Sequence, residues 1–106
     1  MSVTYNTENL IVGKIHTRQV PLDAGTYYKG QRLALNTDQM CDIGSGDYAL
    51  CGVYMGDTET LVDGDVRAVI VGGELSASGV VDSSGDAVTL TEALKVAYQK
   101  LGFYFE

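Results

Sequence analysis

One stretch decides the fold class, residues 66–77, which reads Val66-Arg67-Ala68-Val69-Ile70-Val71-Gly72-Gly73-Glu74-Leu75-Ser76-Ala77. Its first six residues are the most strand-like in the chain, because β-branched and aliphatic side chains favour the extended backbone. The two glycines at 72–73 predict a bulge, after which residues 74–77 continue the strand. We therefore expect a long strand within a β-rich domain.

The hydrophobic period changes near the C-terminus, where one helix is predicted. Thr89 and Thr91 are both suitable N-caps, and Thr89 with Glu92 has the spacing of a capping box. Gly102 stands where a helix commonly stops, and residues 103–105 predict a last strand that ties the C-terminus into the sheet. Four apolar side chains share one face of this helix by their spacing: Leu90, Leu94, Ala97 and Leu101.

Shorter strands are predicted before residue 66. Three segments have the β-branched or alternating character of strands: 10–15, 27–35 and 48–55. Turns are expected at 23–25, 43–47, 56–59 and 62–65. Pro21 argues against a central strand at its position, because proline donates no backbone hydrogen bond.

These patterns predict an α+β domain that is mostly β. We expect a small barrel-like or sandwich-like unit with one C-terminal helix and an extended N-terminal arm; a frayed terminus is the alternative to the arm. The arm and first strand would take residues 1–20, and the β-rich domain residues 21–106. A chain of 106 residues has the size of one domain, which excludes a multidomain enzyme.

The chain is acidic, with seven Lys and Arg against fourteen Asp and Glu and a formal net charge of −7. Phosphate binding needs clustered basic side chains, so neither nucleic acid nor a membrane is expected as a partner. No apolar run approaches the roughly 20 residues that span a bilayer, and no signal peptide is recognised. We expect a protein made inside the cell, with Cys41 and Cys51 reduced; a disulfide between them is the alternative.

Residue types that carry catalysis are few and scattered. His16 is the only histidine, and no motif gives it a partner, so we expect a surface or interface side chain. A Cys–His dyad with Cys41 or Cys51 has no local support. Residues 73–79 do not spell a nucleophile elbow, and the sequence contains no phosphate-binding Gly-x-x-x-x-Gly-Lys loop. We expect a protein that is not an enzyme and needs no cofactor.

Acidic residues gather between positions 57 and 65, where a calcium loop is conceivable. Leu61 stands where a third oxygen ligand is required, so the pattern of an oxygen-rich cation loop is broken. We expect solvated turns and no metal at the four carboxylates concerned: Asp57, Glu59, Asp63 and Asp65.

Several short motifs follow one another in a characteristic order. They are Ala24-Gly25-Thr26-Tyr27-Tyr28-Lys29-Gly30-Gln31-x-Leu33, Cys51-Gly52-Val53-Tyr54, Asp63-Gly64-Asp65-Val66-x-Ala68-x-Ile70-Val71-x-Gly73-Glu74-Leu75 and Leu101-Gly102-Phe103-Tyr104. Their order resembles the phage lambda type of head decoration protein, a family of small proteins that stabilise the capsid from outside. The resemblance extends from Leu22 to Glu106.

The resemblance implies a viral structural protein on the exterior of the expanded icosahedral head, made in the bacterial cytoplasm. Its partners would be the major capsid protein and further copies of itself, as a homotrimer at three-fold and quasi-three-fold positions. The arm would add a strand to capsid subunits. Five apolar residues are the candidates for that contact: Val3, Tyr5, Leu10, Ile11 and Val12.

Two other functions stay open. Residues 25–34 also resemble the Lys-Gly-Gln-x-Leu turn of lipoyl and biotinyl carrier domains, which present a lysine at a hairpin tip. No lysine stands between Lys29 and Lys95, so the middle of the chain lacks an attachment site, and a covalent adduct on Lys29 would distinguish a carrier. A different head or tail accessory protein of a phage is the second alternative.

Overall fold

The structure, a computed structural model, describes residues 10–44 and 49–106. Its elements, in chain order, are β1 (Ile11–Leu22), β2 (Gly25–Tyr27), β3 (Arg32–Asn36), β4 (Gln39–Asp42), β5 (Gly52–Tyr54), β6 (Glu59–Leu61), β7 (Asp65–Leu75), a 3-10 turn (Ala77–Gly79), α1 (Glu92–Gln99) and β8 (Phe103–Phe105). The predicted class, mostly β with a helix near the C-terminus, is confirmed.

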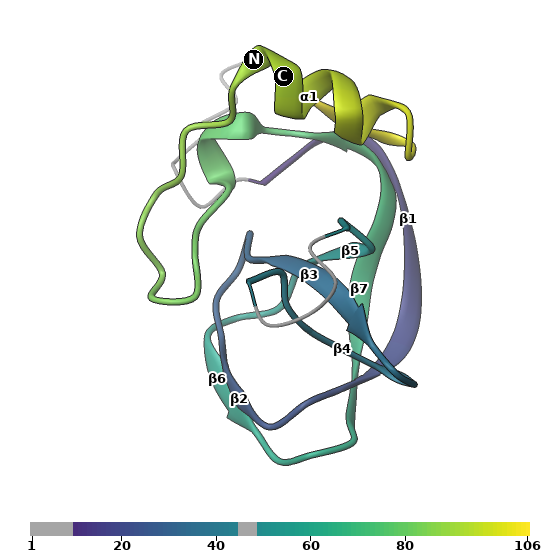
Figure 1. The fold of residues 1–106 in the computed structure, drawn as a ribbon, viewed down its shortest axis with the longest axis vertical. Helices are drawn as coiled ribbons and strands as arrows, with labels where there is room; N and C mark the ends of the chain where they lie inside the picture. Colours follow the sequence, from purple (N-terminus) through teal and green to yellow (C-terminus); the bar gives the residue numbers. More distant parts are fainter. Residues whose placement is uncertain (1–9, 45–48) are drawn as a thin grey trace, which may run out of the picture.

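The main sheet closes into a barrel. Its strands follow the order β1-β4-β3-β5-β7-β8, and β1 also pairs with β7, so the first five form a ring. Leu22 and Met40 make the parallel closure between β1 and β4. β1 and β7 run antiparallel, with register shifts between Ile11 and Ile15 and between His16 and Thr17. β8 lies parallel to the end of β7, and β2 with β6 forms a separate two-stranded sheet. In Figure 1, β1 forms one outer border of the molecule.

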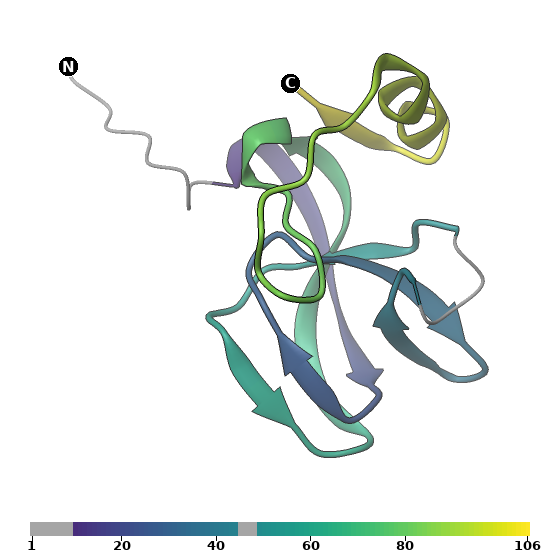
Figure 2. The ribbon, with the colours of Figure 1, turned by 60° about the vertical axis from the view of Figure 1, so that its left-hand side comes forward.

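Two hydrophobic clusters lie on either side of β7, because its central residues are buried on both faces. Ile70 belongs to a helix-end cluster and Val69 to a barrel cluster, and neither is exposed to solvent. Figure 2 shows α1 and β8 at one end of the molecule, with the β2–β6 pair at the other. The helix-end cluster contains Leu10, Leu50, Val53, Ile70, Leu75, Val80, Leu90, Tyr98, Phe103 and Phe105. The barrel cluster contains Val20, Leu22, Tyr27, Leu33, Met40, Tyr54, Leu61 and Val69.

The predicted irregularity in the long strand is confirmed and lies next to the two glycines. His16 pairs with Gly72 and Thr17 with Ile70, so Val71 is the extra residue of a bulge. Gly73 has φ +121°, and a side chain there would collide with the backbone of β1. The glycine therefore allows the two long strands to approach at this point.

The first strand is longer than predicted, because β1 continues through Pro21 to Leu22. Pro21 lies opposite Val66 on β7 without donating to it. On the other edge of β1, the nearest donor is Asp23, whose N–H bonds to the carbonyl of Met40 (2.9 Å). Proline is tolerated because its missing N–H falls at a position where β7 requires none.

The predicted strand over residues 27–35 is confirmed only for its ends, because the chain turns between β2 and β3. Gly30 has φ +91° and its N–H donates to the carbonyl of Tyr54 (2.8 Å). β4 and β6 lie in segments where no strand was predicted, and β5 is shorter than the predicted strand over 48–55. These strands are three to four residues long: β4 forms a hairpin with β3, whereas β5 pairs with β7 and β6 pairs with β2.

The C-terminal prediction is confirmed in outline and corrected in detail. Thr91, rather than Thr89, caps α1, accepting a hydrogen bond from the N–H of Leu94 on its Oγ1 (3.2 Å). Gly102 ends this segment with φ +96°. The predicted apolar face is confirmed in part: Leu90 lies in the helix-end cluster and Leu94 packs against it, whereas Ala97 is exposed and Leu101 is 53% exposed. Tyr98, which was not predicted, is the buried residue of α1. Leu101 lies in the turn beyond the helix, so helical spacing does not apply to it.

Candidate functional site

The most distinctive surface feature is an open strand edge on β1. Leu22 accepts a hydrogen bond at the start of β7, from Gly64 N–H, whereas Asp23 donates on the β4 side, to Met40 (both 2.9 Å). Alternate residues of a strand direct their backbone groups to the same edge. Ile15, Thr17 and Gln19 therefore direct N–H and C=O away from β7; we call these three residues the open edge.

No strand covers the open edge among residues 10–44 and 49–106. β4 reaches β1 only at Leu22, so the six backbone groups of the open edge have no ladder partner in the part of the chain that the structure describes. The bulge at Val71 lies on β7, so the alternation along β1 is unbroken from Ile15 onward. An unpaired edge of this length is a template for a further strand.

Three basic side chains follow the same strand, at alternate positions. Lys14, His16 and Arg18 are all exposed, and we call them the basic row. Alternate residues of a strand lie on one face. Three ion pairs are found in the described structure, Lys29–Asp57, Arg67–Glu59 and Lys95–Glu92, and they leave Lys14 and Arg18 unpaired.

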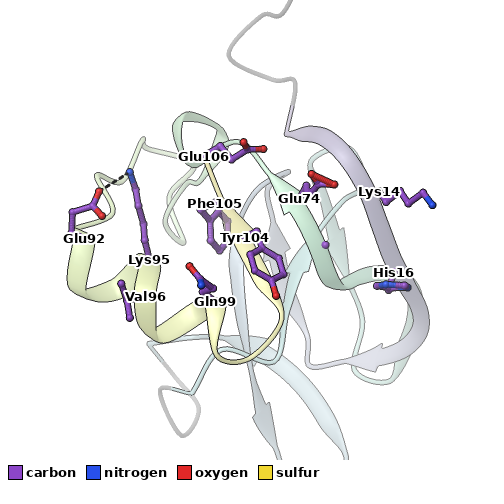
Figure 3. Close-up of a pocket in the computed structure, with 11 residues that line it drawn as sticks. Lys14, His16, Glu74, Glu92, Lys95, Val96, Gln99, Tyr104, Phe105 and Glu106 are labelled. Carbon is purple, nitrogen blue, oxygen red and sulfur yellow. Dashed lines mark ion pairs between the residues drawn. The ribbon is translucent and has the colours of Figure 1, made fainter.

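A shallow groove of about 680 Å³ lies beside the basic row. In Figure 3, Lys14, His16 and Glu74 lie on one side of it and α1 on the other, with β8 between them. The helix contributes Lys95, whose Nζ is 3.6 Å from the carboxylate of Glu92. The titratable groups of the groove are exposed or half-buried and of both signs, which suits a polypeptide surface better than an enclosed small molecule.

Hydrogen-bonded tyrosine side chains connect strands elsewhere in the barrel. Tyr54 Oη donates to Glu59 (2.6 Å), and Arg67 Nε donates to the same oxygen (2.6 Å). Burial and the hydrogen bond to Glu59 raise the pKa of Tyr54 well above its usual value, whereas bonds from Tyr54 and Arg67 lower the pKa of Glu59. Burial, with the nearby Asp23, raises the pKa of Tyr27 to about 12. This network joins β5, β6 and β7, and its hydroxyls stay protonated at neutral pH.

The predicted arm residues divide into three groups. Val3 and Tyr5 lie outside the described residues. Leu10 is only 3% exposed and belongs to the helix-end cluster, with its carbonyl bonded to Ser76 N–H (2.7 Å), so its placement on an arm is wrong. Ile11 is half-buried opposite Leu75, and Val12 is 40% exposed.

The boundary predicted at residue 20 also needs correction. β1 belongs to the barrel through its pairing with β7 and its buried residues Val20 and Leu22. Segment 10–20 is therefore part of the domain and not an appendage. Residues 1–9 are the part of the predicted arm that lies outside the described structure.

The other predicted groups lie apart from one another. Cys41 and Cys51 form no disulfide. Each acidic residue of segment 57–65 has its own contact, such as Asp63 with the Gln39 amide (3.0 Å) and Asp65 with Val62 N–H (3.0 Å). Within the described ranges, no three His, Cys, Asp or Glu side chains are placed to hold a metal ion.

Lys29 lies in the turn between β2 and β3, with Nζ 3.7 Å from Asp57. These two strands pair with other strands and not with each other, so Lys29 is not at a hairpin tip. None of the described helices is long and apolar enough to cross a bilayer.

Comparisons with protein-family models, with curated proteins and with solved structures gave no significant match.

Proposed function

We propose that this chain is a capsid decoration protein of a phage. It binds the major capsid protein on the outside of the expanded head, as a homotrimer at three-fold and quasi-three-fold positions, and stabilises the shell. Its N-terminal segment, with Val3 and Tyr5, adds a strand to capsid subunits.

The ordered set of motifs is the observation that carries the proposal. The motifs fall on strands and turns of this fold. Gly25–Gln31 contains β2 and the turn to β3, Cys51–Tyr54 contains β5, and Asp63–Asp65 leads into β7. Gly73 and Gly102 have positive φ at the approach of β1 and at the end of the helical segment.

The trimer would bind the capsid through several weak contacts made at the same time. A strand addition gains a few backbone hydrogen bonds, and each contributes about 1 kcal/mol in net terms. A trimer with three such segments engages neighbouring subunits together, so the contacts reinforce one another through a high effective concentration. If the binding site forms only when the head expands, the decoration protein binds mature heads and not their precursors.

Co-sedimentation with purified heads tests the proposal. The heads come from the phage whose genome encodes the chain, in expanded and unexpanded forms. We expect saturable pelleting with expanded heads only, weakened by deletion of residues 1–9 and by the double substitution Val3→Ser, Tyr5→Ser. The matched control, Ser2→Ala with Asn6→Ala, changes polar positions of the same segment and should pellet like the wild type. Absence of pelleting with either form contradicts the proposal.

The carrier alternative has a separate test. A carrier would show a covalent mass adduct on Lys29, and a decoration protein would not. The position of Lys29, in a turn and beside Asp57, is not the exposed hairpin tip of those domains. We therefore prefer decoration over a carrier function.

A further inference from the structure

We propose that the open edge of β1 binds an extended, acidic segment of the partner protein. The segment's backbone pairs with the open edge, and its carboxylates lie opposite the basic row. The inference rests on the proposed function for the identity of the partner, the major capsid protein, but not for the chemistry of the segment.

The backbone of the open edge determines the shape of the occupant. Ile15, Thr17 and Gln19 offer three donors and three acceptors to one side of β1, at the border of the molecule (Figure 1). Only an extended polypeptide presents complementary groups at the same repeat. The pairing stops where β4 meets β1 at Leu22, so the occupant spans about five residues.

The side chains of β1 determine the charge of the occupant. Two of the seven Lys and Arg residues of this acidic chain, Lys14 and Arg18, belong to the basic row, and neither has an ion pair in the described structure. Side chains directly opposite in paired strands interact, and opposite charges there are favourable. A partner strand with Glu or Asp at alternate positions satisfies the basic row.

The same row disfavours a second copy of β1 as the occupant. An antiparallel pair centred on His16 would place Lys14 of each copy against Arg18 of the other. Like charges directly opposite destabilise a pair of strands. Charged residues on edge strands commonly prevent self-association in this way, so the basic row selects an acidic partner over another copy.

Proline substitutions test the backbone part of the inference. Thr17→Pro removes an N–H that points away from β7, so the fold should persist with a melting temperature within about 3 °C of the wild type. Pelleting with expanded heads should nevertheless weaken about tenfold. Arg18→Pro removes a donor that faces β7, so it should unfold the barrel. That contrast verifies the direction of the open edge independently of any partner.

Charge substitutions test the side-chain part. The double substitution Lys14→Glu, Arg18→Glu should weaken pelleting about tenfold, because attraction across the strands becomes repulsion. The control is Lys100→Glu, which reverses an exposed lysine beyond α1 and should leave pelleting unchanged. The wild-type affinity should also fall as sodium chloride rises.

A peptide titration separates this inference from the proposed function. The probe is the acetylated, amidated peptide Thr-Glu-Val-Glu-Val-Glu-Thr, followed by amide chemical shifts of the full chain. We expect shifts at the open edge with this peptide and none with its Lys-for-Glu counterpart. If heads bind the wild type and these variants equally, the inference is overturned while the proposed function stands. If heads do not bind at all, the proposed function falls and the titration alone decides the inference: shifts at the open edge support it, and their absence overturns it.

Discussion

Truncation of Leu10 tests where the folded domain begins. Leu10 is 3% exposed, its carbonyl bonds to Ser76, and the backbone of Gly79 lies against it, where an added Cβ would be 3.2 Å from Leu10 Cα. Leucine-to-alanine changes in such sites cost about 2–5 kcal/mol. We take about 3 kcal/mol for Leu10→Ala, because the site is at the end of its cluster. A domain of this size loses about 4 °C per kcal/mol, so the melting temperature should fall by about 12 °C.

The assay is thermal unfolding followed by circular dichroism, with Val12→Ala as the matched control. Val12 is 40% exposed, so its truncation should change stability by no more than about 0.5 kcal/mol. If Leu10→Ala and Val12→Ala have equally small effects, Leu10 is not part of the core, and the claim that the folded domain begins at residue 10 is wrong.

Three further predictions concern the cap, the tyrosines and a turn. Thr91→Ala should cost about 1 kcal/mol in chemical denaturation, and equal losses from Thr89→Ala would contradict Thr91 as the cap. The pKa of Tyr27 is raised to about 12, so its contribution to stability is complete below pH 10 and lost as the pH rises towards 12. Tyr27→Phe should flatten that loss in alkaline titrations; an unchanged slope would refute the shift. Gly30→Ala should lower the melting temperature by more than 10 °C, because φ is +91° and the added Cβ meets the carbonyl of Gly79; a neutral result would refute that packing.

The sequence predicted those strands and that helix whose formation depends on residues close to one another in the chain. The apolar run over 66–71 is β7, the capping threonine and Gly102 delimit the helical segment, and residues 103–105 are β8. Each of these has a cause within a few residues: β-branched side chains, a cap, or a glycine with positive φ.

The remaining elements depend on contacts between distant residues. β6 contains one apolar residue, and it becomes a strand because β2, more than thirty positions away, supplies the pairing. Leu10 looked like part of an arm, because its burial comes from Ser76 and Gly79, more than sixty positions away. No local pattern contains that information.

The open edge of β1 was not foreseen either. Whether a strand has one neighbour or two depends on where β4 meets the barrel, which the sequence does not state. The alternation of Lys14, His16 and Arg18 in a β-rich segment was the available signal, because charges on a strand are typical of an edge.

Hydrogen exchange of β1 tests the central claim most directly. In the isolated protein, the amides of Thr17 and Gln19 should exchange quickly and those of Arg18 and Val20 slowly, because only the latter two face β7. Bound to expanded heads, peptides covering residues 14–20 should become protected, and the Thr17→Pro variant should lose that protection with its binding. Slow exchange of Thr17 and Gln19 in the free protein, or unchanged exchange on heads that bind the protein, would contradict strand addition at this edge.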